Sequence, residues 1–316
     1  MGMYRLGDMI RMTRKSLSIT QEQLCDGICS IETLSRIETG RQSPSRDTYE
    51  LLMERMGRIR ERAYSMLSVS DFKVLEKMKL FEDYIKLYDY HRAETVLNKI
   101  KKTLGNTVLD RQFILRAESI INYRLNRITV DKFLEGLQNA ICLTIPEYGT
   151  ISLSCWPLNI NETRLLINIS TAYAEKKEYD KGIYILEEVN NAMEQSYMDE
   201  QQRVDLQVII INNLSKWYGL TGNYEKAIRI SKDGVAICKK YKLGNVLPIL
   251  LYNITWNMEQ LIHKGVLPAV YKKECLKYLR QAYYIASAMQ QPFTEQFIEK
   301  HVNTIYNNSF ETFEIQ

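Results

Sequence analysis

Apolar side chains recur at helical spacing through the first sixty residues of this chain. Leu6, Met9 and Ile10 fall on one face of a helix, and Leu34 and Ile37 do so further on. The pattern predicts four short helices, of which the second and third are joined by the tight turn "GICS". Two short helices joined in this way form a helix-turn-helix arrangement.

Helix-capping residues precede three of these predicted helices. Thr20, Ser30 and Ser45 are residue types preferred at N-caps, because their hydroxyls accept a hydrogen bond from a free backbone N–H. Gln23 stands three residues after Thr20, in the position that completes a capping box. Gly40 follows the third helix, where a left-handed residue is favoured. The sequence therefore predicts defined ends for these helices.

A different pattern repeats four times between residues 90 and 227. An aromatic residue is followed three positions later by Ala or Gly, which is typical of the second helix of a tetratricopeptide pair. The pairs are Tyr90 and Ala93, Phe133 and Gly136, Tyr179 and Gly182, and Tyr224 and Ala227. The aromatic residues are 43, 46 and 45 positions apart, more than the about 34 of an ordinary tetratricopeptide repeat. Long paired helices are therefore expected.

The C-terminal part continues this pattern. A fifth pair begins at "LLYNITWNMEQ", its second helix covers about residues 271–289, and a final helix at 293–308 is expected to cap the array. The segment 144–161 is predicted to be a loop, and 58–67 a basic helical stretch. The predicted fold is all-α, with a helix-turn-helix domain at 1–66 and an α-solenoid of about five tetratricopeptide-like pairs at 67–310.

Asparagine recurs at one position of the repeats. The residues eleven positions before the four aromatics are Lys79, Asn122, Asn168 and Asn213, and Asn253 continues the series. A buried amide without a partner costs roughly 1–3 kcal/mol, so these side chains need partners. An amide both donates and accepts hydrogen bonds, which suits the backbone of an extended peptide. Hydrogen bonds within the array, to the same or a neighbouring repeat, are the alternative.

Composition narrows the class of protein. The chain has 316 residues, 45% of them apolar and 25% charged, with a net charge of +4. No apolar run reaches the ~18 residues that cross a membrane. Residues 1–66 hold 11 Lys or Arg against 9 Asp or Glu, so charge alone does not identify a nucleic-acid partner. Six scattered cysteines predict free thiols in a cytoplasmic protein.

The sequence contains no recognisable catalytic motif. A phosphate-binding G-x-x-x-x-G-K-[ST] loop does not occur, and the three His residues lie far apart without ligand spacing. Cys25 and Cys29 have no matching pair and no nearby His. We therefore expect no enzyme activity, no cofactor and no metal site.

The stretch "TQEQL…GICSIETLSRIETGRQSPS" resembles the phage-repressor-like (Xre) helix-turn-helix family over about a fifth of the chain. Its short turn and the long repeats resemble the peptide-pheromone regulators of the RRNPP group (PlcR, PrgX and Rgg). This resemblance implies that Arg14 and Glu38 pair inside the domain. A degenerate domain that binds no DNA is the alternative.

The residues expected to contact DNA follow from their positions on and beside the predicted second and third helices. Arg36 is suited to guanine O6 and N7, and Glu32 to cytosine N4, whereas Gln21 and Arg41 are suited to phosphates. The full expected set is Gln21, Ser30, Ile31, Glu32, Thr33, Arg36, Arg41 and Ser43.

The resemblance to pheromone receptors favours ligand contact for the asparagine series, with basic neighbours for an acidic group. The expected peptide-binding residues are Asn122, Asn126, Arg164, Asn168, Asn213, Lys216, Asn253 and Asn257. The implied protein is a homodimeric, cytoplasmic transcription regulator that binds double-stranded DNA and is controlled by a short signalling peptide. The alternative is a scaffold whose repeats bind a folded protein partner.

Overall fold

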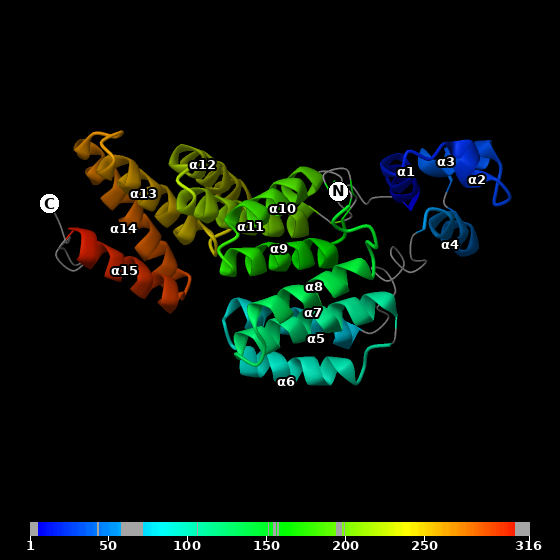
Figure 1. The fold of residues 1–316 in the computed structure, drawn as a ribbon, viewed down its shortest axis with the longest axis horizontal. Helices are drawn as coiled ribbons and strands as arrows, with labels where there is room; N and C mark the ends of the chain where they lie inside the picture. Colours follow the sequence, from blue (N-terminus) through cyan, green and yellow to red (C-terminus); the bar gives the residue numbers. More distant parts are fainter. Residues whose placement is uncertain are drawn as a thin grey trace. The chain divides into compact units, whose positions relative to one another are not determined.

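The structure is a computed structural model that describes residues 6–42, 44–57, 72–105, 107–150, 152–153, 156, 158–193, 198 and 200–306. These residues form helices and turns and no strand, which confirms the predicted all-α class (Figure 1). The chain divides into two compact units, Met1–Glu200 and Gln201–Gln316. The predicted domain boundary at 66/67 and the basic stretch 58–67 lie outside the described residues.

Four short helices at the N-terminal end of the first unit share one apolar core. They are α1 (Leu6–Ser16), α2 (Gln21–Cys25), α3 (Ile31–Glu38) and α4 (Arg46–Arg55). The core is made of residues from all four helices and from the turn after α4: Ile10, Leu24, Cys25, Leu34, Ile37, Tyr49, Leu52, Met53 and Met56. The apolar positions that predicted the helices are thus the positions that hold them together.

The predicted caps of these helices are confirmed. Thr20 forms both bonds of a capping box with Gln23, at 3.1 and 2.8 Å. The Ser30 hydroxyl accepts from the Thr33 backbone N–H at 3.1 Å, and Ser45 caps α4 in the same way. Gly40 has φ of +71°, a left-handed conformation that glycine adopts without strain. Local side-chain chemistry therefore fixes the turn between α2 and α3.

Three helical hairpins make up the rest of the first unit. Each first helix packs on its own second helix: α5 (Phe72–Lys86) on α6 (Tyr90–Lys101), α7 (Val108–Arg124) on α8 (Val130–Cys142), and α9 (Ile160–Glu175) on α10 (Tyr179–Ala192). Successive hairpins touch through α6 and α7 and through α8 and α9. This is the arrangement expected of a helical repeat array.

The small residues of the repeat pattern lie where the paired helices approach closely. Ala93 and Ala227 are fully buried. A Cβ atom added to Gly136 would lie 2.5 Å from the Ser119 hydroxyl oxygen, which is closer than real carbon atoms approach. A larger side chain at these positions would push the two helices apart, and this explains the aromatic–small signature.

The predicted loop 144–161 connects α8 to α9 and is anchored to the core. Ile145, Trp156 and Leu158 are buried, and Asn159 forms a capping box with Glu162 at the start of α9. The described residues of this connection thus pack on the core and cap the start of α9.

The second unit contains the remaining pairs and the capping helix. Its helices are α11 (Glu200–Leu220), α12 (Tyr224–Tyr241), α13 (Leu247–His263), the short 3-10 helix η2 (Ala269–Tyr271), α14 (Lys272–Ala288) and α15 (Pro292–Tyr306). Ser215 of α11 hydrogen-bonds Ser231 and the Ala227 carbonyl of α12. The predicted fifth pair and final helix are confirmed.

A polar cluster fixes the capping helix α15 to α13. His301 Nε2 lies 2.9 and 3.1 Å from the two carboxylate oxygens of Glu259, and the Tyr306 hydroxyl donates to Glu259 at 2.6 Å. Ile298 and Val302 of α15 are fully buried in an apolar cluster with Leu251 of α13 and Leu279 of α14. The last helix thus closes the apolar end of the second unit, as a terminal repeat must.

Candidate functional site

Helix α3 has one buried face and one exposed face. Leu34, Ile37 and Glu38 are buried, whereas Glu32 and Arg36 are exposed. Ile31 is 44% exposed although it is a large apolar residue. The Arg36 guanidinium makes no hydrogen bond to another residue in the part of the chain that the structure describes. The exposed face therefore presents a free cation beside an apolar group.

Capping bonds set the position of the residues at the start of α3. The hydroxyls of Ser30 and Thr33 lie 3.0 Å apart. The pKa of Glu32 is below its ordinary value because its carboxylate accepts from its own backbone N–H and from Ser30, with a smaller contribution from Arg36. Glu32 is therefore ionised at neutral pH and accepts hydrogen bonds.

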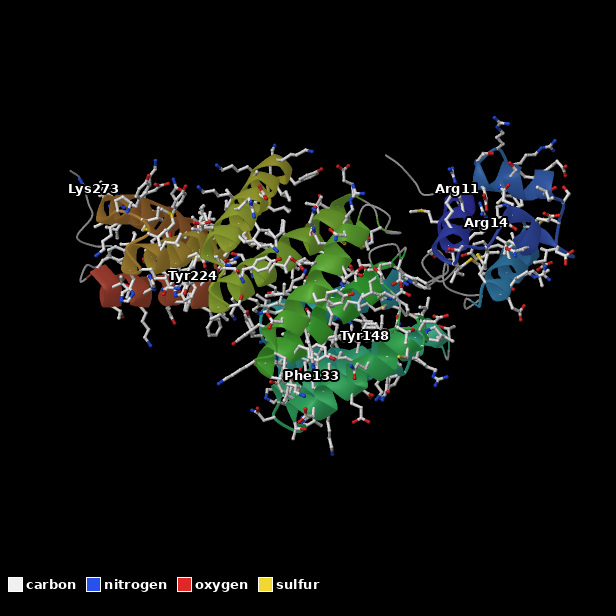
Figure 2. The ribbon with its side chains drawn as sticks, turned by 45° about the horizontal axis from the view of Figure 1, so that its top comes forward. Arg11, Arg14, Phe133, Tyr148, Tyr224 and Lys273 are labelled. Atoms are coloured by element: carbon white, nitrogen blue, oxygen red, sulfur yellow. The ribbon has the colours of Figure 1, made fainter. Side chains whose placement is uncertain are left out.

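A buried ion pair supports α3 from within the domain, as the resemblance implied. Arg14 of α1 pairs with Glu38 of α3 through two hydrogen bonds of 2.6 and 2.8 Å, and its Nη1 also donates to the Ile19 carbonyl at 2.9 Å. Figure 2 shows Arg14 among the α1–α4 helices. The hydrogen bond to Glu38 raises the pKa of Arg14. One cation and one anion balance each other here.

Gln21 takes part in the same cluster. Its amide nitrogen donates to Glu38 at 2.8 Å, so this predicted phosphate contact has a role inside the domain. Arg41, just beyond α3, is exposed and its side chain makes no hydrogen bond among the described residues. Ser43 lies outside the described residues.

A second charged cluster joins the first helices of three hairpins in the first unit. Arg116 of α7 is 3% exposed and pairs with Glu82 of α5. Its Nη1 donates to the Asn168 side-chain oxygen at 3.1 Å, and its Nε has no partner. Arg164, one turn before Asn168 on α9, is 27% exposed and lies 3.7 Å from Glu82.

This cluster is not balanced in charge. Two guanidinium groups share the single carboxylate of Glu82. Burial lowers the pKa of Arg116; Glu82 raises it, and the charge of Arg164 lowers it. Guanidinium groups stay protonated in proteins, so the cluster keeps an excess positive charge.

The other asparagines of the first unit lie apart from this cluster. Asn122 is half-buried and its side chain makes no hydrogen bond to a described residue. It is six residues from Arg116, about 240° around the helix. Asn126 follows the end of α7, is exposed, and has φ of +56°. The structure therefore does not show a single continuous row of amides in this unit.

The amides of the second unit fall into two groups. Asn253 is buried and donates to the Asn212 side-chain oxygen at 3.0 Å. Asn257 is buried and donates to the Asn253 carbonyl at 2.7 Å. Asn213 is half-buried and Lys216 exposed, and neither side chain hydrogen-bonds a described residue. Hydrogen bonds within the second unit thus explain the buried amides of Asn253 and Asn257. The Asn213 amide has no such partner among the described residues.

Sequence reasoning missed Glu82, Arg116 and Asn212. Arg116 carried a signal, because it stands among the core positions Phe113 and Ala117 on an otherwise apolar stretch of α7. A charge at such a position predicts a buried partner. Glu82 carried no comparable signal, since acidic residues are frequent on exposed helix faces.

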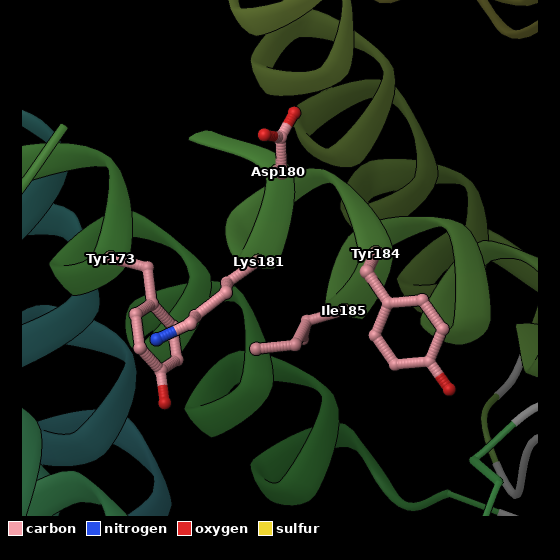
Figure 3. Close-up of a pocket in the computed structure, with 5 residues that line it drawn as sticks. All are labelled: Tyr173, Asp180, Lys181, Tyr184 and Ile185. Carbon is pink, nitrogen blue, oxygen red and sulfur yellow. The ribbon is translucent and has the colours of Figure 1, made fainter. Parts of the chain in front are cut away.

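An open depression of about 360 Å³ lies on the third hairpin, lined by residues of α9 and α10. It is lined by Tyr173, Asp180, Lys181, Tyr184 and Ile185. Figure 3 shows the Lys181 amine beside the Tyr173 ring, 5.3 Å from its centroid. None of the residues expected from the sequence lines it.

The described residues contain neither a metal-binding cluster nor a membrane-spanning helix. No group of three or more His, Cys, Asp and Glu side chains is placed to hold a metal ion. No described helix is both long enough and apolar enough to cross a membrane.

Residues 5–63 match a family model described as a helix-turn-helix domain, in agreement with the caps and core of α1–α4. No curated protein matches the sequence. The sequence match thus identifies residues 5–63 as a helix-turn-helix domain.

Solved structures resemble nearly the whole chain. Bacillus thuringiensis PlcR in complex with the peptide PapR7 and DNA has a TM-score of 0.61 and 18% identity, over 93% of this chain and 98% of that chain. The apo form of the same protein has a TM-score of 0.60 and 17% identity, over 95% and 98%. ComR from S. thermophilus, in complex with DNA and its signalling peptide ComS, has 0.51 and 15%, over 94% and 98%. At these identities the likeness shows the fold, and it confirms the predicted resemblance in architecture.

Proposed function

We propose that this chain is a DNA-binding transcription regulator controlled by a short linear signalling peptide, as in quorum sensing. The observation that carries the proposal is the helix-turn-helix match over residues 5–63 together with the exposed, uncommitted Arg36 on the capped helix α3. The fold likeness to PlcR, which was solved with both a peptide and DNA, supports control by a signalling peptide. Binding and regulation, without catalysis, account for these features.

The DNA contact is proposed for the exposed face of α3. Arg36 donates to guanine O6 and N7, Glu32 accepts from cytosine N4, and Ile31 packs on a thymine methyl group. Ser30 and Thr33 position the start of the helix, and Arg41 and Ser43 bind phosphate. A homodimer places two such helices about one DNA turn apart, ~34–36 Å.

The peptide contact is proposed for the amides that the fold leaves open. In the first unit these are Asn122 and the Asn168 nitrogen, since the Asn168 oxygen already accepts from Arg116. In the second unit the open amide is Asn213, with Lys216 one turn further. Each amide can bind a peptide group through its C=O and N–H. Asn126, Asn253 and Asn257 have a smaller role, because the first lies outside the helix and the others are buried.

Control requires that the peptide bind one conformation of the repeats better than another. Only this difference in affinity shifts the population of DNA-binding states. A cytoplasmic location agrees with the five cysteines among the described residues, which are all free thiols and thus suit a reducing compartment.

Selection from a random double-stranded DNA pool with the full-length protein tests the DNA half. The wild type is expected to enrich a two-fold symmetric sequence. Arg36→Ala should lose at least about 1–3 kcal/mol of specific binding and relax the preference at one base pair, whereas Arg41→Ala should weaken binding to all sequences alike. Arg92→Ala, the same charge change on α6, is the control. Enrichment of the same sequence by Arg36→Ala would overturn the assignment of α3.

Affinity selection from a random heptapeptide library tests the peptide half. The full-length wild type is expected to retain peptides, and Asn213→Ala to retain fewer at an unchanged melting temperature. Asn98→Ala, an exposed asparagine of α6, is the matched control. Retention of folded proteins with no retention of peptides would favour a scaffold instead.

A further inference from the structure

The connection between α13 and α14 exposes large apolar side chains to solvent. Val266 is 58% and Val270 68% exposed, and together they form what we call the apolar tip. Tyr271, the last residue of η2, is exposed beside them. Figure 1 shows this connection at one end of the α13–α14 pair. Exposed apolar side chains that lie close together mark interaction sites, whereas single ones do not.

Backbone bonds and packing hold the connection in this conformation. Gly265 follows α13 with φ of +72°, and the Val266 backbone N–H donates to the Leu261 carbonyl at 2.9 Å. Leu267 packs on the apolar cluster shared by α13 and α14. Because Leu267 takes the inward position, the apolar tip on either side of it faces solvent.

Lysines flank the apolar tip on both sides. Lys264, Lys272 and Lys273 are all exposed, and they form what we call the lysine rim; Figure 2 labels Lys273. Residues 260–273 contain these three lysines and no Asp or Glu. Glu274, the next residue, is half-buried and accepts a hydrogen bond from Tyr278. The rim therefore keeps its positive charge.

Charge distinguishes the apolar tip from the exposed aromatic residues of α15. Phe293 and Phe297 are also exposed, but the same helix carries Glu295 and Glu299 among them. Acidic neighbours repel an anionic partner. The connection between α13 and α14 instead combines exposed apolar groups with cations alone, which fits a partner that is both apolar and anionic.

We propose that the apolar tip and the lysine rim dock this protein on an anionic membrane surface. The apolar tip enters the boundary between headgroups and acyl chains, and Tyr271 lies at the headgroup level, where tyrosine is favoured. The lysine rim pairs with lipid phosphates, as basic clusters do at the negatively charged cytoplasmic leaflet.

A lipid surface satisfies both parts of this face. The phosphates of a nucleic acid would pair with the lysine rim and leave the apolar tip in water. The tip is a projecting turn, and a fluid lipid surface conforms to such a shape. This inference goes beyond the proposed function and does not depend on it.

Flotation of the full-length protein with lipid vesicles tests the inference. The wild type is expected to float with vesicles of equimolar phosphatidylglycerol and phosphatidylcholine, and not with phosphatidylcholine alone. Each lysine near an anionic surface strengthens binding about fivefold, so Lys272→Gln combined with Lys273→Gln should weaken it about 25-fold. Val266→Ser combined with Val270→Ser should weaken it at least about tenfold at unchanged charge.

A matched control has the same change in charge at another place in the second unit. The Lys264 amine lies 4.7 Å from the ring centroid of Tyr224, the first residue of α12. Lys239 and Lys240, in the last turn of α12, are therefore at the opposite end of that helix. Lys239→Gln combined with Lys240→Gln should float as the wild type does. All these positions are exposed, so each variant should keep the wild-type melting temperature.

Four outcomes would contradict the inference. The first is a wild type that does not float with the anionic vesicles. The second is an equal loss in the two lysine variants, which would mean that net charge alone attracts the protein. The third is unchanged flotation of the valine variant, which would mean that the apolar tip does not enter the lipid. The fourth is retention on immobilised polyglutamate without flotation, which would assign this face to an acidic protein partner.

Discussion

Two regions of this chain hold a buried arginine beside a glutamate, and they differ in charge balance. In the helix-turn-helix domain, one guanidinium, Arg14, meets one carboxylate, Glu38, through two hydrogen bonds. In the repeats, Arg116 and Arg164 share Glu82. Correspondingly, the hydrogen bond to Glu38 raises the pKa of Arg14, whereas burial lowers that of Arg116.

The difference separates a cluster whose charges cancel from one that keeps an excess positive charge. A balanced buried pair satisfies its own charges and gains nothing from a further ion. An unbalanced cluster bears a cost that an added anion removes. Both clusters contain arginine and glutamate, so residue types do not distinguish them. The number of cations for each carboxylate distinguishes them.

The largest effect is expected for Glu82→Gln. This change leaves two guanidinium groups facing each other without a carboxylate, and breaking a buried pair costs about 3–5 kcal/mol. Hydrogen exchange of the full-length protein should show faster exchange in α5, α7 and α9. Glu118→Gln, an exposed partner of Lys101 on α7, should change little. Unaltered protection of α7 would mean that Arg116 is not dependent on Glu82.

A smaller but still large effect is expected for Glu38→Gln. Removal of the carboxylate should cost about 3 kcal/mol, at the lower end of the range for buried pairs, because Arg14 keeps its bond to the Ile19 carbonyl. Hydrogen exchange should increase in α1 and α3 and not in the repeats. Glu22→Gln on the exposed side of α2 is the control. Loss of protection in the repeats as well would contradict the separation of the two clusters.

Asn253 and Asn213 allow the same comparison between a side chain with an internal partner and one without, here for uncharged groups. Asn253→Ala should lower the stability of the second unit by about 1 kcal/mol, because it removes the hydrogen bond to Asn212. Asn213→Ala should leave the unfolding midpoint nearly unchanged. Chemical denaturation of both variants measures the difference. An equal loss from the two substitutions would show that Asn213 has an internal partner.

The smallest effect on stability is expected for Arg164→Gln. The substitution leaves Arg116 and Glu82 as a balanced pair, so the free energy of unfolding should change by no more than about 0.5 kcal/mol. Thermal unfolding without peptide checks this. A loss as large as that of Glu82→Gln would assign Arg164 to the structural cluster.

Much of the helix-turn-helix domain was predictable because its determinants are local. The caps of Thr20, Ser30 and Ser45 act over three residues, and each was confirmed. The Arg14–Glu38 pair was implied by resemblance, since its partners lie 24 positions apart. The exposure of Arg36 follows from the period of α3, because Leu34 and Ile37 fix which face is buried.

The repeat pattern was predictable for a similar reason. The aromatic residue and the small residue three positions later both contact the first helix of their own hairpin, as Phe133 does with Tyr123 and Gly136 with Ser119. The position of Asn168 in its repeat was also visible, but its partner was not. Arg116 lies 52 positions from Asn168 and 34 from Glu82, in other hairpins.

The sequence by itself determined the helices, their ends, the faces they bury and the pairing of neighbours, because these depend on contacts within one or two helices. Only the tertiary structure decided which polar side chains are satisfied and which remain open. Asn253 and Asn213 occupy similar positions, yet one is bonded to Asn212 and the other is not. Hydrogen bonds and charge balance depend on groups brought together from distant hairpins. The direction of each side chain decides whether its polar atoms come within the roughly 3 Å of a hydrogen bond.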